Sequence, residues 1–90
     1  MAKHPSAAKR HRQSITKQAR NQAIRSRVRT SVRHVRDALA TQNATEAETR
    51  LKQATRTIDK AVTKGVLHRN TASRKISRLT QALRQLTAPA

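Results

Sequence analysis

The apolar residues of this 90-residue sequence repeat with the period of an α-helix and with no other visible period. They recur mostly in steps of four and three, which places them in a narrow stripe along one helix face. Because three segments carry such a stripe, the sequence predicts an all-α, antiparallel three-helix bundle in which the stripes pack together. The stripes are Ile24, Val28, Val32, Val35 and Leu39; Ala47, Leu51, Ala54, Ile58, Ala61 and Val62; and Ala72, Ile76, Leu79, Leu83 and Leu86.

Capping residues indicate where the second and third helices begin and end. Thr45 followed by Glu48 has the spacing of a capping box, and Asn70 is a good N-cap. Gly65 suits the position just past a helix end, with Val66 as the hydrophobic contact behind it. The expected helices span about 46–64 and about 71–86.

The first helix is longer than its apolar stripe. Nothing between residues 6 and 41 breaks a helix, but the stripe loses its phase before Ile24. At about 100° per residue, Ile15 lies on the opposite side from Ile24, and the direction that continues the stripe carries Arg10 and Lys17. A bundle core cannot extend there, so the front of this helix should project by up to ~25 Å at ~1.5 Å per residue. The expected organisation is a basic N-terminal arm and front of helix one over 1–21, a three-helix bundle over 22–87 and a frayed tail over 88–90.

Charge is strongly unbalanced and unevenly distributed. The chain has 21 Lys and Arg against four Asp and Glu, a net charge of +17. Residues 1–36 hold eleven bases and no acid, residues 37–68 five bases and four acids, and residues 69–90 five bases and no acid. Both ends therefore resemble contact surface, and the middle resembles ordinary protein surface. An organelle-targeting peptide would also begin Arg-rich and acid-free, but here the basic excess returns at the other end.

This composition favours a polyanionic partner. Val, Ile and Leu number 15, which at this net charge is close to the composition of chains that stay disordered on their own. Arg outnumbers Lys 14 to 7, and a guanidinium grips phosphate with two donors. Since the chain has no aromatic residue on which single-stranded bases could stack, recognition should depend on charge, hydrogen bonds and shape, which suits folded RNA.

Several function classes are not expected. The chain has no Cys, no apolar run of the ~20 residues that span a membrane, and four His that lie far apart. Four acids are too few for paired-carboxylate catalysis, and one Gly cannot form a phosphate-cradling loop. We therefore expect no enzyme activity, no cofactor and no metal.

The basic residues of the three helices lie in rows. A row beside the first stripe has no acid to relieve its like charges before Asp37, and like charges at this spacing destabilise an isolated helix. We therefore expect this row to face a polyanion. The row on the second helix shares its surface with Glu46, Glu48 and Asp59, which favours a solvated face, and the row on the third helix continues into Gln81 and Gln85. The rows are Arg25, Arg29, Arg33 and Arg36; Lys52, Arg56, Lys60 and Lys64; and Arg74 with Arg78.

Three stretches resemble the bacterial small-subunit ribosomal protein twenty family, whose members are short, basic, three-helix proteins. The last of the three is too long and too irregular in sequence to match by chance. The three stretches are Ala2-Lys3-His4 through Ser6-Ala7 to Lys9-Arg10; Arg20-Asn21 with Ser26-Arg27-Val28-Arg29-Thr30; and Ile58-Asp59-Lys60-Ala61, Lys64-Gly65-Val66, His68, Asn70-Thr71-Ala72, Arg74-Lys75 and Ser77-Arg78-Leu79.

The resemblance implies a structural component of the small ribosomal subunit that binds folded small-subunit ribosomal RNA directly and stabilises it during assembly. It also implies a cytoplasmic, ribosomal location and few or no protein contacts. We expect no membrane contact and no homo-oligomer. The RNA contacts that the resemblance implies are Lys9, Arg10, Arg12, Arg20, Asn21, Ser26, Arg29, Thr30, His68, Asn70, Arg74, Lys75, Ser77 and Arg78. The arm and the first basic row add Lys17, Arg25 and Arg33.

The sequence departs from the family pattern at Gln18, Ile76 and the pair Thr80-Gln81, where many members are basic. These departures leave open how far the third helix contacts RNA. Two other functions are compatible with the composition. A DNA-compacting protein would use a wedge of large apolar residues on an arm, which is absent here. A membrane-active cationic helix would need a Trp, Phe or Leu-rich face, and the front of the first helix offers only Ile15 and alanines.

Overall fold

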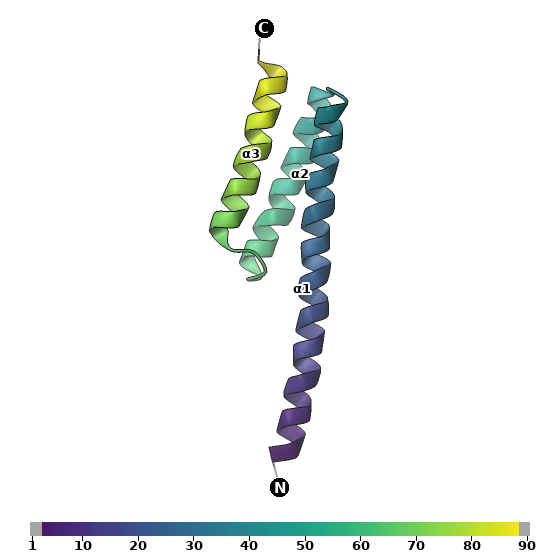
Figure 1. The fold of residues 1–90 in the computed structure, drawn as a ribbon, viewed down its shortest axis with the longest axis vertical. Coiled ribbons are helices and arrows are strands. Elements are labelled where there is room, and N and C mark those ends of the chain that lie inside the picture. Colours follow the sequence, from purple (N-terminus) through teal and green to yellow (C-terminus); the bar gives the residue numbers. More distant parts are fainter. Residues whose placement is uncertain (1–2, 89–90) are drawn as a thin grey trace.

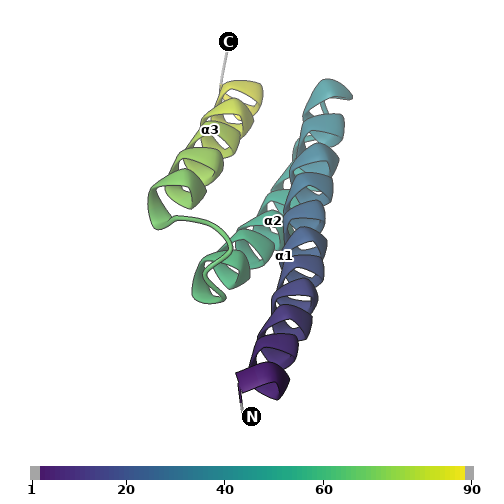
Figure 2. The same ribbon diagram turned by 60° about the horizontal axis from the view of Figure 1, so that its bottom comes forward.

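The chain forms three α-helices joined by short turns (Figure 1). The computed structural model describes residues 3–88, with side chains described from residue 7. The helices are α1 (Lys3–Ala40), α2 (Ala44–Thr63) and α3 (Arg69–Thr87), and no strand occurs between residues 3 and 88. Each helix runs antiparallel to the one before it, and α1 extends well past the other two at its N-terminal end (Figures 1 and 2). The expected antiparallel three-helix bundle with a long projecting first helix is confirmed.

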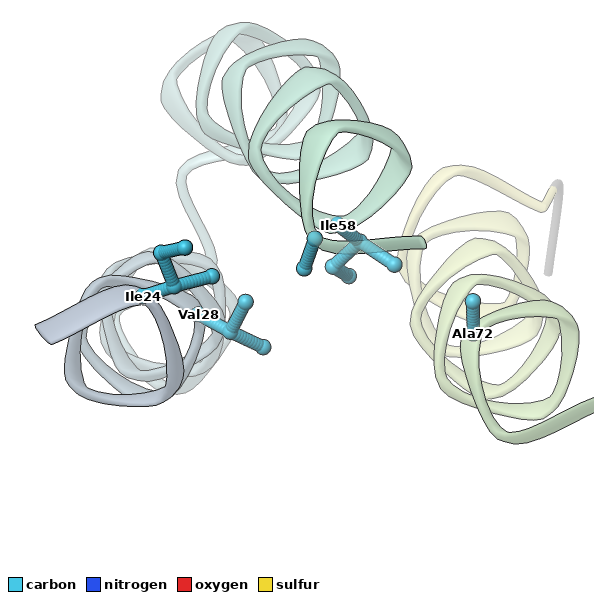
Figure 3. Close-up of a cluster of buried hydrophobic side chains, with 5 residues drawn as sticks. Ile24, Val28, Ile58 and Ala72 are labelled. Atoms are coloured by element: carbon cyan, nitrogen blue, oxygen red, sulfur yellow. The ribbon is translucent and has the colours of Figure 1, made fainter. Parts of the chain in front are cut away.

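The core is formed where the three apolar stripes meet. One cluster joins Ile24 and Val28 of α1 to Ile58 of α2 and Ala72 of α3 (Figure 3). The second cluster, nearer the α1–α2 turn in sequence, joins Val35, Ala54 and Leu79. Large aliphatic side chains occur on α1 and small Ala residues on α2 and α3 at several of these positions, so the helices approach closely with little volume to fill.

The apolar stripes predict most of the core, although some stripe residues, such as Val32 and Ile76, are half-buried and pack against its edge. Leu83 and Leu86, which were expected to be buried, are only half-buried and belong to neither core cluster. Ala38, outside the expected stripe, is 6% exposed. The end of α3 thus contributes less to the core than its Leu content suggests, because α3 packs mainly through Ala72 and Leu79.

The first turn of α2 is capped by a different residue from the one expected. The N-cap is Asn43, whose Oδ1 accepts a hydrogen bond from the Glu46 backbone N–H at 3.1 Å. The prediction that Thr45 forms a capping box with Glu48 is wrong, and α2 begins two residues earlier than expected. Asn43 with Glu46 has the same spacing, and an Asn side chain caps at least as well as a Thr.

The turn between α2 and α3 follows the expected glycine geometry. Gly65 has φ +75°, its N–H donates to the Val62 carbonyl, and the Val66 N–H donates to the Ala61 carbonyl. This pair of bonds is a Schellman motif. The N-cap of α3, however, is His68 rather than Asn70: the His68 Nδ1 accepts a hydrogen bond from the Asn70 backbone N–H at 3.1 Å, and α3 begins at Arg69.

The projecting front of α1 has no packing partner. Every described side chain from residue 7 to residue 20 is exposed, and Ile15 is 53% exposed. Within α1, burial begins at Asn21 and Ile24, where the expected stripe begins. We call residues 7–20 the arm and residues 21–87 the body. Residues 1–2 and 89–90, the ends of the expected arm and tail, lie outside the described residues, and Ala88 follows α3 as its C-cap.

Candidate nucleic-acid interface

The acidic residues that offset positive charge gather near the α1–α2 turn. Glu46 pairs with Arg50 at 2.8 Å and Glu48 with Lys52 at 3.8 Å, and the described part of the chain contains no other salt bridge. Both pairs are solvent-exposed, so each contributes at most about 1 kcal/mol to stability. The bases of the arm, of the rest of α1 and of α3 therefore have no acidic partner among the side chains that the structure describes.

The arm presents its cations on one side, within about 160° of its circumference at about 100° per residue. Its five bases are all exposed, and shallow concave surface lies among Lys9, Arg12 and Lys17, with Gln13 and Thr16 between them. A helix that buries nothing and carries unrelieved like charge is a poor element of a free protein but a suitable contact surface for phosphate. The five bases, all predicted site residues, are Lys9, Arg10, Arg12, Lys17 and Arg20.

The basic row of α1 meets a base of α3 in a groove. Arg29, Arg33 and Arg36 line one wall, Lys75 lines the other, and the half-buried Val32 lies between them. Four like charges that converge from two helices repel one another in the free protein and attract one or more phosphates. The structure thus brings together predicted site residues from distant parts of the sequence, with Arg36 as an addition from the same row. Arg25 is exposed on α1 one helical turn before Arg29.

The remaining predicted residues of α3 are exposed outside that groove. Arg74, Ser77 and Arg78 are all exposed, but none lines the α1–α3 groove. His68 and Asn70 lie at the start of α3, where the ring of His68 accepts the capping hydrogen bond. This bond gives His68 a structural role, while its side chain remains exposed.

Three predicted polar residues of α1 lie at or near the junction of arm and body. Ser26 is exposed and Thr30 is half-buried. Asn21 is also half-buried, and its buried Oδ1 has no hydrogen-bond partner. Polar atoms in this state are rare in folded proteins. Asn21 is the first half-buried side chain after the exposed residues 7–20, so it lies where the exposed arm meets the packed body.

A second groove contains cations that the sequence analysis did not select. It lies between α1 and α2 and is lined by Arg27, Lys60 and Lys64, with Ile24 and Thr57 beside them. The sequence does show Lys60 and Lys64 at i, i+4 spacing, but three acids in the same segment favoured a solvated face. Glu46 and Glu48 form their ion pairs in the first half of α2, so they do not offset the end at Lys60 and Lys64.

The described residues form neither a metal cluster nor a membrane span. The side chains described, those of residues 7–88, include no group of three or more His, Cys, Asp or Glu that could hold a metal ion. None of the three helices is both long enough and apolar enough to span a membrane.

Comparison with known proteins identifies the family. Residues 2–84 match the family model described as ribosomal protein S20. This chain belongs to the S20 family. Among its relatives, the small ribosomal subunit protein bS20 of Nitratidesulfovibrio vulgaris is 51% identical over 86 residues, which cover 96% of this chain and 99% of the relative.

Other S20 relatives match over similar lengths. The bS20 protein of Syntrophotalea carbinolica is 57% identical over 79 residues, covering 88% of this chain and 91% of the relative. That of Acidiphilium cryptum is 50% identical over 90 residues and covers both chains fully. The resemblance inferred from the three sequence stretches is therefore confirmed across almost the whole chain.

Proposed function

We propose that this protein is a structural component of the small ribosomal subunit, where it binds folded small-subunit ribosomal RNA directly and stabilises it during assembly. The observation that carries the proposal is the set of bases from α1 and α3 that have no acidic partner, on a chain whose S20 relatives are named small ribosomal subunit proteins. The location is accordingly the ribosome in the cytoplasm. As a ribosomal protein of this family, it is not an enzyme.

The contacts with RNA divide between the arm and the body. The arm supplies phosphate contacts from an unpacked helix, and the body supplies the α1–α3 groove together with exposed bases and polar groups at the start and middle of α3. What supports this division is the burial of the side chains, which are exposed from residue 7 to residue 20 and first half-buried at Asn21. The predicted contact residues stay as proposed: Lys9, Arg10, Arg12, Lys17, Arg20, Asn21, Arg25, Ser26, Arg29, Thr30, Arg33, His68, Asn70, Arg74, Lys75, Ser77 and Arg78.

RNA is the principal partner, with few or no protein contacts and no homo-oligomer. Ile15 is the one large apolar side chain among residues 7–88 that is exposed, so the described surface offers little for a protein interface to bury. The net charge of +17 further opposes self-association. Size-exclusion chromatography with light scattering should therefore give the mass of a monomer, about 10.1 kDa.

A competition experiment tests the proposed partner against DNA compaction, the principal alternative. The protein is titrated with a transcript of small-subunit ribosomal RNA and, at the same salt concentration, with duplex DNA of equal length. Specific nucleic-acid complexes are typically about 10³-fold or more tighter than non-specific ones, and we expect a preference for the RNA of that order. Equal affinities would instead support non-specific compaction, and weak binding to both would contradict the proposal.

A further inference from the structure

The groove between α1 and α2 is separate from the contact surface described so far. Arg27 projects from α1 on a different side from the basic row: at about 100° per residue, Arg36 lies about 180° and Arg29 about 200° around the helix from it. The two grooves are therefore on opposite flanks of α1. A single phosphate cannot contact both.

The helix dipole accounts for two of the three cations in this groove and not for the third. Lys60 and Lys64 lie at the C-terminal end of α2, where cations stabilise the helix dipole. Arg27 lies in the middle of α1, where no helix end requires a cation. Neither ion pair of the described residues involves these three bases, so no carboxylate that the structure describes neutralises them by direct contact.

The groove also continues the line of the arm. Lys9, Arg20 and Arg27 are separated by 11 and 7 residues within one unbroken helix. At about 100° and ~1.5 Å per residue, they share one side within about 20° over a length of about 27 Å. The concave surface among Lys9, Arg12 and Lys17 lies on this side as well. The charged track therefore leads from the arm directly into the groove at the end of α2.

We propose that Arg27, Lys60 and Lys64 form a second phosphate site, which holds the backbone of an RNA segment that runs along the arm. This segment differs from the one bound in the α1–α3 groove. Three cations in one groove suit the phosphate backbone, because Arg and Lys pair with phosphate oxygens and no acidic side chain lines the groove to repel them. The inference rests on the proposed function, since it assigns a further contact with the same ribosomal RNA.

The test replaces the three bases by glutamine and measures binding to a small-subunit ribosomal RNA transcript over a range of salt. The variant is Arg27→Gln with Lys60→Gln and Lys64→Gln. Losing three phosphate contacts should flatten the slope of log K against log salt by about 2 to 3. If the variant and the wild type bind equally at 1 M salt, this difference in slope corresponds to an affinity loss on the order of 100-fold near 0.15 M.

The matched control removes the same charge elsewhere. Lys52→Gln with Arg56→Gln and Arg84→Gln also loses three exposed bases, none of which lines either groove or the concave surface of the arm. We expect less than half the effect on slope and affinity. If the control and the groove variant lose slope and affinity equally, diffuse charge accounts for binding and the second site is wrong.

Hydroxyl-radical footprinting of the RNA separates the two grooves. When the Arg27, Lys60 and Lys64 variant is bound, the RNA should lose protection at nucleotides that the Arg29→Gln, Arg33→Gln, Arg36→Gln variant still protects. The second variant should in turn lose protections that the first variant keeps. Loss at the same nucleotides would overturn the proposal of separate segments. Arg27→Gln alone leaves the helix dipole of α2 untouched, so its loss of the same protections excludes unfolding of α2 as the cause. If the wild type itself leaves no footprint, the proposed function fails, not only this inference.

Discussion

The arm and the body belong in part to the same helix, yet they are held in their conformations by different forces. In the body, α1 buries Ile24, Val28 and Val35 against α2 and α3. In the arm, α1 buries no described side chain. Helix formation in the arm depends on local hydrogen bonds and residue propensity, whereas in the body tertiary packing stabilises it.

This difference shows that a continuous helix need not be a single functional unit. The body gives the chain a fixed shape, with a core made of few and small side chains. The arm gives up that packing and presents its exposed bases on one side. A chain of this size buries a smaller fraction of its surface than a large domain does, so separating the two tasks leaves its limited core free of charge.

The largest effect should follow from removing the arm. Deleting residues 1–20 removes six bases and no acid. The loss of four to six phosphate contacts should flatten the slope of log K against log salt for ribosomal RNA by about 3 to 5, with a steep fall in affinity. The thermal unfolding transition, followed by circular dichroism, should stay nearly unchanged because the described arm residues bury nothing.

A full-length variant provides the control for the deletion. With the six bases of residues 1–20 replaced by glutamine, affinity should fall almost as far as in the deletion. These bases are Lys3, Lys9, Arg10, Arg12, Lys17 and Arg20. If the six-glutamine protein binds RNA like the wild type, the arm acts by its backbone or shape and not by its charge.

A pair of isoleucine substitutions compares burial in the two regions directly. Ile58→Ala removes a side chain that is 0% exposed in the body and should cost about 2 to 5 kcal/mol of unfolding free energy. Ile15→Ala makes the same chemical change on the arm, where the side chain is 53% exposed, and should change stability by less than about 0.5 kcal/mol. Denaturant unfolding of both variants measures the difference. Similar costs would mean that the arm packs against the body in solution.

The smallest of the three effects concerns the turn before α3. At φ +75°, a residue with a side chain is strained, and a Cβ at position 65 would meet no heavy atom within 4 Å. The cost of Gly65→Val is therefore a backbone cost, which we expect to exceed about 1 kcal/mol in thermal unfolding. Gly65→Asn should cost less, because Asn tolerates this conformation. Equal stability of the Val, Asn and wild-type proteins would show that the turn does not require a positive φ.

The fold could be predicted from the sequence because the apolar residues that form the core repeat with the period of a helix. The stripe from Ile24 to Leu39 gives the buried face of α1, and its loss of phase before Ile24 gives the start of the arm. The helix starts were less predictable. Asn43 with Glu46 and Thr45 with Glu48 offer the same capping pattern, and the choice depends on where the chain leaves the preceding helix, which the pattern does not contain.

The candidate site was predictable along each helix but not between helices. Spacing alone places Arg29 and Arg33 on one side of α1. It does not show that Lys75 faces them, or that Lys60 and Lys64 face Arg27, because these neighbours depend on how the helices are rotated against each other. The acids near Lys60 in the sequence were also misleading, since in space two of them pair with other bases.

The unbroken course of α1 from Lys3 to Ala40 restricts where the length of such a chain can change. One residue inserted near Asn21 would turn every side chain of the arm by about 100° relative to the body and move it by about 1.5 Å. The cations of the arm would no longer line up with Arg27. An insertion in the turns at 41–43 or 64–68 leaves the arm and Arg27 in the same rotation relative to each other along α1. Insertions and deletions should therefore be tolerated between the helices of this protein and not within its first helix.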